Sequence, residues 1–403
     1  MRISTSTIYE TGTKLMLQQQ EQLMKTQQQL STGKSILTPS DDPISAAQIL
    51  TISQSASLND QYAINRDYAN SSLSQEENVL RKITDVLQSV QSSTVYGGNA
   101  SLTDTDRRIL ATELRSHLES LISLANTTDE KGQYLFSGYQ SNTKPFTQTG
   151  LTVQFAGDQG QRLNQVGPAR QIAISDSGVD IFERIKDGNG VFTTAANASN
   201  LGTGIIDVGS VVTPSSLTGD NYQINFTVTA GVTTYDIVDV TTGASISTGN
   251  AYVENNVISF DGMQLSIKGQ PENGDSFTVS PSSNKSIFNT MEDLITALEA
   301  PSSGQPGGTR LTNSLNTVLQ NLSNSMENIL TTQASIGARL QEIDALESVG
   351  SDQNIQYQQK LSQLQDVDFA KATSDLQRQD LYLQAAQQAY IKVTGLSLFN
   401  YIS

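Results

Sequence analysis

The sequence predicts an α+β fold in which both chain ends form long antiparallel helices, a bundle or coiled-coil rod, with a β-hairpin region and an inserted all-β outer domain. On the C-terminal side, apolar residues recur at helical steps of three, four or seven: Leu311, Leu315, Val318, Leu322, Met326, Ile329, Ile336, Leu340 and Ile343. On the N-terminal side the same spacing joins Leu73, Leu80, Ile83, Leu87 and Val90. Between them the period changes to two, as in strands. Because isolated helices are marginal in water, we expect the two seams to pack together, which brings the termini side by side.

The composition argues against several classes of function. The 403 residues carry 24 Lys and Arg against 40 Asp and Glu, and the formal charge of -16 repels nucleic acid. Charged residues make up only 16%, so the surface can pack against copies of itself with few charges to desolvate. The chain has no Cys, and no apolar run is long enough to span a bilayer or form a secretory signal core. We therefore expect no cofactor, no membrane insertion and, if the protein is exported, no cleaved signal peptide.

The first segment, residues 3–30, is a predicted helix. Apolar side chains recur there at spacings of seven or eight within a Gln-rich run, and Gln is a good helix former; they are Ile8, Leu15, Leu23 and Leu30. The alternative is a disordered polar tract. After a break at residues 31–34, we expect Asp42 to cap the next helix and Pro43 to be its first residue. That helix should run to about Val95.

Short helices and strands should follow. Thr103 or Asp104 can cap a helix that ends near Asn126. Alternating residues then predict strands around residues 134–136, 153–155 and 172–174, and one helical turn around 181–185. Residues 190–284 are rich in Thr, Ser, Gly and Val, with predicted strands around 222–228, 235–240, 257–260, 265–267 and 277–279. They form the predicted all-β insert.

Helix returns after the insert. Thr290 begins a capping-box pattern for a short helix, and the Pro/Gly stretch 301–308 separates this helix from the long C-terminal one. We expect the long helix to break at residues 348–352 and a last helix to end at Gly395. The predicted domains are residues 1–33 with 366–403, residues 34–189 with 285–365, and residues 190–284.

The chain offers little for catalysis. His117 is the only histidine, so a histidine metal site or a catalytic triad has no partner residues. The adjacent carboxylates Asp41 and Asp42 are better explained by turn and capping chemistry. The run 187–190 lacks the spacing of a calcium loop and predicts a tight turn. We expect no catalytic and no metal site.

The C-terminal run is unusually apolar for a chain end. It holds Leu396, Leu398, Phe399 and Ile402. It either folds back on its own molecule or docks between subunits, and the small core near the termini favours docking. Full burial would contribute about 1.5 to 3 kcal/mol per side chain.

Motifs at both ends resemble a known family. In the N-terminal half they are residues 1–5, Ser31-Thr32-Gly33-Lys34, Pro39-Ser40-Asp41-Asp42-Pro43, residues 102–107, Leu124-Ala125-Asn126 and Tyr134-Leu135-Phe136-Ser137-Gly138-Tyr139; near the C-terminus they are Asp366-Val367-Asp368-Phe369 and residues 383–399. The chain resembles the bacterial flagellin family, and within it the branch that joins hook to filament. Residues 190–284 match no motif of the family and look like an outer-domain insertion.

The resemblance implies a structural axial protein of the flagellum, exported unfolded through the flagellar type III apparatus and held beforehand by an export chaperone at its C-terminal region. It would assemble as a homo-oligomeric ring between a neighbouring hook-associated protein and flagellin. The expected assembly residues are Ile3, Ile8, Leu15, Leu23, Leu30, Leu383, Tyr390, Leu396, Leu398, Phe399 and Ile402. The alternatives are flagellin itself, the filament subunit, and a surface adhesin that uses the β insert.

Overall fold

The computed structural model describes residues 5–395 and divides into two compact units. Unit 1 comprises Met1–Ile64 and Ala345–Ser403, and unit 2 comprises Asn65–Asp344. Both divisions fall inside long helices, α2 (Pro43–Gly97) and α5 (Gln305–Gln365). The predicted fold class, with long helices from both chain ends and an inserted all-β region, is confirmed. The division into three domains stays a prediction.

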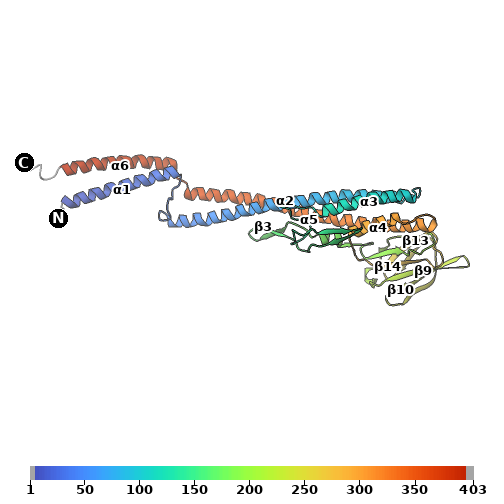
Figure 1. The fold of residues 1–403 in the computed structure, drawn as a ribbon. Coiled ribbons are helices and arrows are strands. Elements are labelled where there is room, and N and C mark those ends of the chain that lie inside the picture. The colour runs from blue at the N-terminus through green and yellow to red at the C-terminus, as the bar shows by residue number, and fades with distance from the viewer. Residues whose placement is uncertain (1–4, 396–403) are drawn as a thin grey trace, which may run out of the picture. The chain divides into compact units, whose positions relative to one another are not determined.

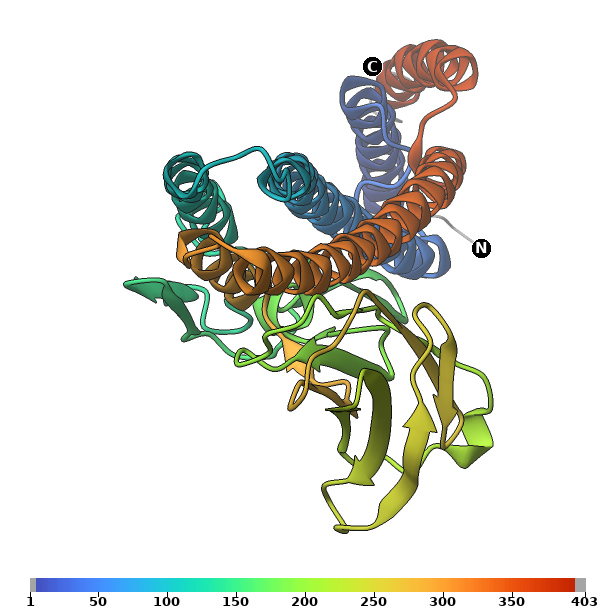
Figure 2. The same cartoon turned by 90° about the vertical axis from the view of Figure 1, so that its right-hand side faces the viewer.

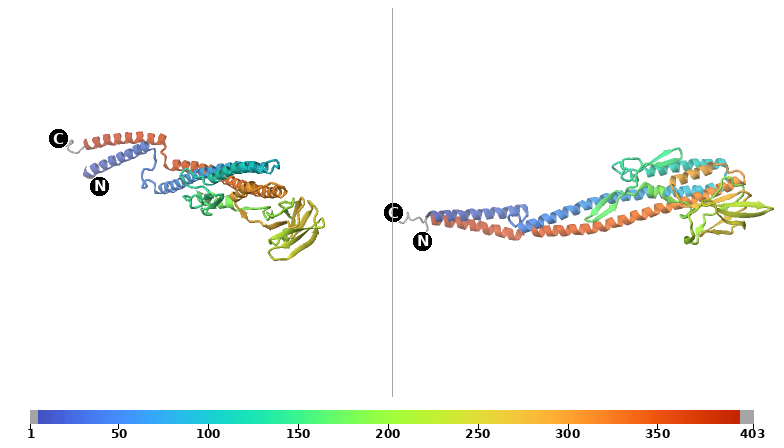
Figure 3. Two further views of the ribbon diagram at one scale, coloured as in Figure 1. Left: turned by 45° about the vertical axis from the view of Figure 1, so that its right-hand side comes forward. Right: turned by 90° about the horizontal axis from the view of Figure 1, so that it is seen from below.

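Unit 1 is built mainly from helices, with one isolated β-bridge between Lys34 and Asp366 among its described residues. Helix α1 (Thr5–Thr32) lies antiparallel to α6 (Phe369–Gly395), as Figures 1 and 3 show. The predicted break at residues 348–352 is wrong, because α5 is continuous there. Gly350 is buried inside the helix, and its carbonyl accepts a hydrogen bond from Asn59 Nδ2 of α2 at 2.8 Å. The glycine is therefore explained by the close approach of α2 and α5 at this point.

Unit 2 holds the main helical core. Figure 2 shows the remaining parts of α2 and α5 beside α3 (Asp104–Ala125) and α4 (Ile287–Glu299). The predicted seams face this core, and most of their residues are buried. Thr103 caps α3 in a capping box with Asp106, as the sequence allowed. The capping box explains why α3 begins at Asp104.

The predicted cap at Thr290 is wrong. Helix α4 begins at Ile287, and Ser286 is its N-cap, whose Oγ accepts a hydrogen bond from the Asn289 backbone N–H at 2.9 Å. Ile287 and Phe288 are fully buried, so the helix needs their apolar side chains in its first turn. Thr290 is buried one turn later, and its hydroxyl donates to the Ser286 carbonyl at 3.2 Å.

Short hairpins connect α3 to the insert. They are β1 (Phe146–Thr149) with β2 (Thr152–Phe155), and β3 (Leu163–Gly167) with β4 (Arg170–Ala173). A π-helical turn (Val179–Glu183) follows, and β5 (Ile185–Lys186) before the insert pairs with β15 (Asn284–Lys285) after it. The predicted strand at residues 134–136 is wrong: this stretch is a buried turn followed by Gly138, whose φ is 71°. Within this turn, the ring of Phe136 packs edge-on against the ring of Phe182.

The insert is a sandwich of two antiparallel sheets around one core. One sheet has the order β11-β10-β9-β14-β6 and the other β12-β13-β7, with β8 also paired to β13. The strands are β6 (Phe192–Ala196), β7 (Ile205–Ile206), β8 (Ser210–Val211), β9 (Tyr222–Thr229), β10 (Val232–Asp239), β11 (Ser245–Ala251), β12 (Val257–Phe260), β13 (Met263–Lys268) and β14 (Ser276–Pro281). The alternation at residues 222–228 is confirmed, since Tyr222, Ile224 and Phe226 are buried.

Asparagines along α5 hold the β region in place. Asn313 Oδ1 accepts from the Ile206 N–H at 3.0 Å, and its Nδ2 donates to the Gly204 carbonyl at 3.0 Å. Asn324 Nδ2 donates to two further backbone carbonyls, and Asn328 Nδ2 does the same one turn later. These neutral side chains satisfy backbone groups that strand pairing leaves open.

Candidate assembly surface

The described part of the chain holds no cluster of metal-binding side chains. Within residues 5–395 no group of three or more His, Cys, Asp or Glu side chains could hold a metal ion, and none of the helices there is long and apolar enough to cross a bilayer. Asp42 caps α2: its Oδ1 accepts from the Ile44 and Ser45 backbone N–H groups, both at 3.1 Å, and Pro43 is the first helical residue.

Helices α1 and α6, from opposite ends of the chain, form a two-stranded antiparallel coiled coil, named here the terminal hairpin. The less exposed residues of each helix follow one another at alternating steps of four and three, the heptad spacing of a coiled-coil seam. On α1 they are Gly12, Met16, Gln19, Leu23, Thr26 and Leu30, and on α6 they are Ala372, Leu376, Gln379, Leu383, Ala386 and Tyr390. The seam holds few large apolar side chains, so it buries little apolar surface.

The two ends of this coiled coil are held differently. At one end the Val367 N–H donates to the Gly33 carbonyl at 2.9 Å. At the other end the ring of Tyr390 lies against Gly12, where an added Cβ would come within 2.7 Å of the ring. Tyr9 packs edge-on against Tyr390, with ring centroids 6.1 Å apart.

Two amide side chains interrupt the seam. Within the described residues, Oε1 of Gln19 and Oε1 of Gln379 are buried and have no hydrogen-bond partner. A buried acceptor without a partner costs about 1 to 3 kcal/mol. The seam alone therefore gives the hairpin little stability.

Unit 1 leaves its large apolar side chains outside. Among its described residues Ala372 is the only buried hydrophobic one. The exposed large hydrophobic residues are Tyr9, Leu15, Leu17, Met24, Ile44, Leu50, Leu58, Ile64, Val349, Ile355, Phe369, Leu381, Tyr382 and Ile391. Leu17 is 61% exposed and Leu381 62%. These exposed apolar side chains are available for contacts with other molecules.

These side chains point to more than one side of the hairpin. Leu15 and Leu17 are two residues apart, which separates them by about 200° around α1. Leu381 and Tyr382 on α6 are about 100° apart by the same geometry. A helix that is apolar on several sides is suited to burial among several neighbours.

A polar loop fixes α1 to the start of α2. Asp41 Oδ1 accepts from Lys25 Nζ of α1 at 2.6 Å, and its Oδ2 accepts from the Leu37 and Thr38 N–H groups at 3.1 and 3.0 Å. The hydrogen bond from Lys25, followed by those of the loop backbone, lowers the pKa of Asp41 to about 2. The two aspartates of the motif thus have separate tasks, since one orders the loop and the other caps the helix.

The predicted assembly residues fall into three groups. Leu15 is exposed, whereas Leu23, Leu30, Leu383 and Tyr390 lie half-buried in the seam between α1 and α6. Ile8 is part of α1, but its side chain lies outside what the structure describes. The third group lies outside the described residues: Ile3, Leu396, Leu398, Phe399 and Ile402. Their part in assembly stays a prediction.

Sequence reasoning missed several exposed apolar residues of α1 and α6. They are Leu17, Met24, Leu381, Tyr382 and Ile391. Each falls outside the heptad stripe that carries the seam. The signal in the sequence that could have identified them is the presence of apolar residues outside the heptad stripe of a Gln-rich helix.

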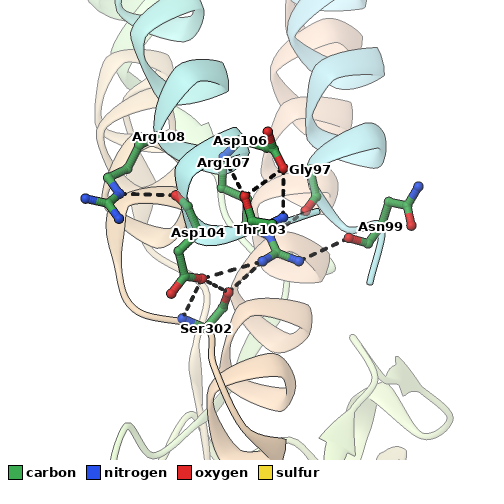
Figure 4. Close-up of polar contacts among 8 residues, drawn as sticks. All are labelled: Gly97, Asn99, Thr103, Asp104, Asp106, Arg107, Arg108 and Ser302. Atoms are coloured by element: carbon green, nitrogen blue, oxygen red, sulfur yellow. Dashed lines mark hydrogen bonds and ion pairs between the residues drawn. The ribbon is translucent and has the colours of Figure 1, made fainter. Parts of the chain in front are cut away.

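A buried arginine closes the end of the helical core in unit 2 (Figure 4). Arg107 donates to the Gly97 carbonyl at 3.2 Å, to the Asn99 carbonyl at 3.0 Å and to Ser302 Oγ at 2.7 Å. Asp104 Oδ1 accepts from Ser302 Oγ at 2.5 Å and lies 3.7 Å from the guanidinium. One side chain thus joins the end of α2, the start of α3 and the loop before α5.

A second buried charge cluster lies where the hairpins meet α2 and α5. Glu76 is 1% exposed; its Oε1 accepts from the Asp176 N–H at 3.1 Å, and within the described residues its Oε2 has no hydrogen-bond partner. Asp176 pairs with Arg339 of α5 and accepts from Gln161 Nε2 at 2.9 Å. Burial, followed by the charge of Asp176, raises the pKa of Glu76 to about 8, and Arg339 opposes this shift.

Comparison with known proteins defines the class. Residues 3–141 match the protein family described as the bacterial flagellin N-terminal helical region. Residues 195–281, which lie inside the predicted insert, match the family described as the D2-like domain of flagellar hook-associated protein 1. Together with the paired terminal helices, these matches place the chain in the class of flagellin-like proteins of the flagellum.

Relatives that match over their full length narrow the class. Flagellar hook-associated protein 3 of Salmonella typhimurium is 30% identical over 401 residues, 99% of each chain, and that of Escherichia coli is 29% identical with the same coverage. The crystal structure of flagellar hook-associated protein 3 from Legionella pneumophila has 30% identity and a TM-score of 0.74, covering 78% of this chain and 98% of that one. FlgL of Xanthomonas campestris has 30% identity and a TM-score of 0.71, covering 77% and 99%. The chain therefore belongs to the flagellar hook-associated protein 3 family.

Membership of this family determines the general function of the chain. The chain is a structural, non-enzymatic component of the bacterial flagellum, with a role at the junction of hook and filament. The predicted family and structural role are confirmed, and the full-length relatives favour the junction branch over flagellin or an adhesin.

Proposed function

We propose that the chain joins hook to filament by packing α1 and α6 against copies of itself and against neighbouring axial proteins. The observation that carries this proposal is the exposed apolar surface of unit 1, where Ala372 is the only buried hydrophobic residue among those described. Burying Leu17, Met24 and Leu381 on assembly would contribute about 1.5 to 3 kcal/mol each. That surface lies on several sides of the hairpin, which fits a helix pair surrounded by neighbours.

The same features support the remaining parts of the proposal. The chain would form a homo-oligomeric ring between another hook-associated protein and flagellin, with residues 1–33 and 366–403 innermost, residues 34–189 and 285–365 around them, and residues 190–284 outermost. An export chaperone would cover the C-terminal helix before assembly, since its exposed apolar side chains would otherwise associate.

The test replaces exposed apolar side chains of the hairpin. The triple variant Leu17→Gln, Met24→Gln, Leu381→Gln keeps good helix formers, so the circular dichroism of the purified chain should be unchanged. In a strain that lacks the native protein, this variant should give cells without filaments that release flagellin into the medium. Normal filaments on those cells would overturn the proposal.

A matched control separates this surface from the insert. Val232, Val240 and Val253 are similarly exposed but lie in the β insert. The triple variant Val232→Gln, Val240→Gln, Val253→Gln makes the same kind of apolar-to-amide replacement in the insert and should restore filaments to the deficient strain. Loss of filaments with this control would instead point to the insert as the joining surface.

A further inference from the structure

The register of the terminal hairpin needs an explanation beyond its heptad pattern. Both stripes repeat every seven residues, so shifting α1 along α6 by one heptad, about 10.5 Å, would again set seam positions against seam positions. A shifted hairpin would carry the exposed side chains Leu17 and Leu381 to different relative heights. The assembly surface depends on one register being chosen.

One layer of the seam is not interchangeable with the others. The Tyr390 ring occupies the space beside Gly12, where a Cβ would come within 2.7 Å of Cδ2 and 2.9 Å of Cε2. In the register this contact sets, Met16 comes level with Ala386 and Leu30 with Ala372. A shift of one heptad would bring Tyr390 level with Gln19 instead, where a side chain already fills the seam. Among the six seam residues of α1, Gly12 is the only one without a side chain.

We propose that Gly12 and Tyr390 form a register lock for the terminal hairpin, a gap and a knob that select one alignment of α1 on α6. The backbone hydrogen bonds of Val367 and Ser35 fix the base of the hairpin, and the lock fixes its tip three heptads away. The two amides Gln19 and Gln379 weaken the seam between these points, so the tip depends on the lock. The proposal deepens the proposed function, because it names the residues that determine how the assembly surface is presented.

The absence of cysteine allows a direct test in the purified full-length chain. The pair Met16→Cys, Ala386→Cys reports the native tip, Leu30→Cys, Ala372→Cys reports the base, and Leu23→Cys, Ala386→Cys reports a shift of one heptad. Disulfide formation requires Cα atoms closer than about 7 Å, so each pair reports one register. The native chain should cross-link at tip and base and not in the shifted pair.

Gly12→Leu should lower the cross-linking rate at the tip by at least about tenfold and leave the base unchanged. Leucine is a better helix former than glycine, so a loss cannot come from helix propensity. The exchange Gly12→Leu with Tyr390→Ala swaps knob and gap and should restore the tip. Tyr390→Ala alone should raise cross-linking of the shifted pair.

Two results would overturn the lock. One is a tip rate within twofold of the native chain in Gly12→Leu, which would mean that the seam and the base set the register alone. The other is a loss at tip and base together that the swap fails to restore. The cross-links are read in the monomer, so a chain that fails to assemble in cells while keeping them would count against the proposed function and not against the lock.

Discussion

Replacing Glu76 by glutamine should remove a pH dependence from the stability of unit 2. The side chain is buried between α2, the loop around Asp176 and Arg339 of α5, and its pKa is raised from 4.5 to about 8. Glutamine has the same shape and no charge. The variant therefore tests whether this carboxyl keeps its proton in the folded chain.

The sign and size of the effect follow from proton linkage. Below pH 4.5 the carboxyl is protonated in both the folded and the unfolded chain. Between pH 4.5 and about 8 the folded chain keeps a proton that the unfolded chain has lost, so the free energy of unfolding falls by about 1.4 kcal/mol per pH unit. Over the whole window the loss is about 4 to 5 kcal/mol. Above about pH 8 it does not grow further.

Hydrogen exchange measured by mass spectrometry is the suitable assay. After correction for intrinsic exchange rates, peptides covering residues 70–80 and 173–178 should lose protection in the native chain between pH 5.5 and 8.5. In Glu76→Gln their protection should stay nearly constant. Glu77→Gln is the matched control, because Glu77 is the next residue and pairs with Arg81 at the surface. A native pH profile in Glu76→Gln would show that the Glu76 carboxyl is not the source of the pH dependence.

Three further predictions concern single side chains. Urea titration of Arg107→Met should show the free energy of unfolding of unit 2 lowered by about 3 to 5 kcal/mol, because the variant leaves buried hydrogen-bond acceptors unpaired. A loss below about 1 kcal/mol would contradict a stabilising role for the Arg107 contacts shown in Figure 4. Ser286→Ala should cost about 1 kcal/mol by the same titration, and Ser286→Asp clearly less, because aspartate also caps a helix N-terminus. The pKa of Asp41 is lowered to about 2, so its pairing with Lys25 should stabilise the loop above about pH 4 and be lost as the pH falls towards 2; carboxyl titration by NMR should show this, and a midpoint near 4 would contradict it.

The helices were predictable because their signals are local. The caps Asp42 and Thr103 stand directly before apolar periodic runs, and the helices begin there. Thr290 failed as a cap because the sequence around it offers two capping serine or threonine positions one turn apart. The choice between them depends on burial of Ile287 and Phe288, which only the tertiary packing decides.

The strands of the insert were predictable only where one face is buried. Strand β9 alternates buried and half-buried residues, and its sequence shows that pattern. Strand β11 is exposed or half-buried along its length at the edge of its sheet, so its residues carry no alternation. Strands β7 and β8 have two residues each, too few to show a period.

The candidate surface was predictable in place but not in detail. Apolar spacing showed that the chain ends are amphipathic helices, yet spacing alone does not tell whether a stripe packs within the chain or against a neighbour. The structure places Leu23 and Leu383 in the intramolecular seam and leaves Leu17 and Met24 outside it. That distinction depends on which face α1 turns to α6.

Thiol labelling tests most directly whether the hairpin becomes buried on assembly. Met24→Cys and Leu381→Cys, made singly in this cysteine-free chain, should react quickly with a maleimide in the dilute monomer. In isolated flagella they should react at least about tenfold more slowly, while Val253→Cys in the insert reacts equally in both. Equal reactivity of Met24→Cys and Leu381→Cys before and after assembly would contradict the account.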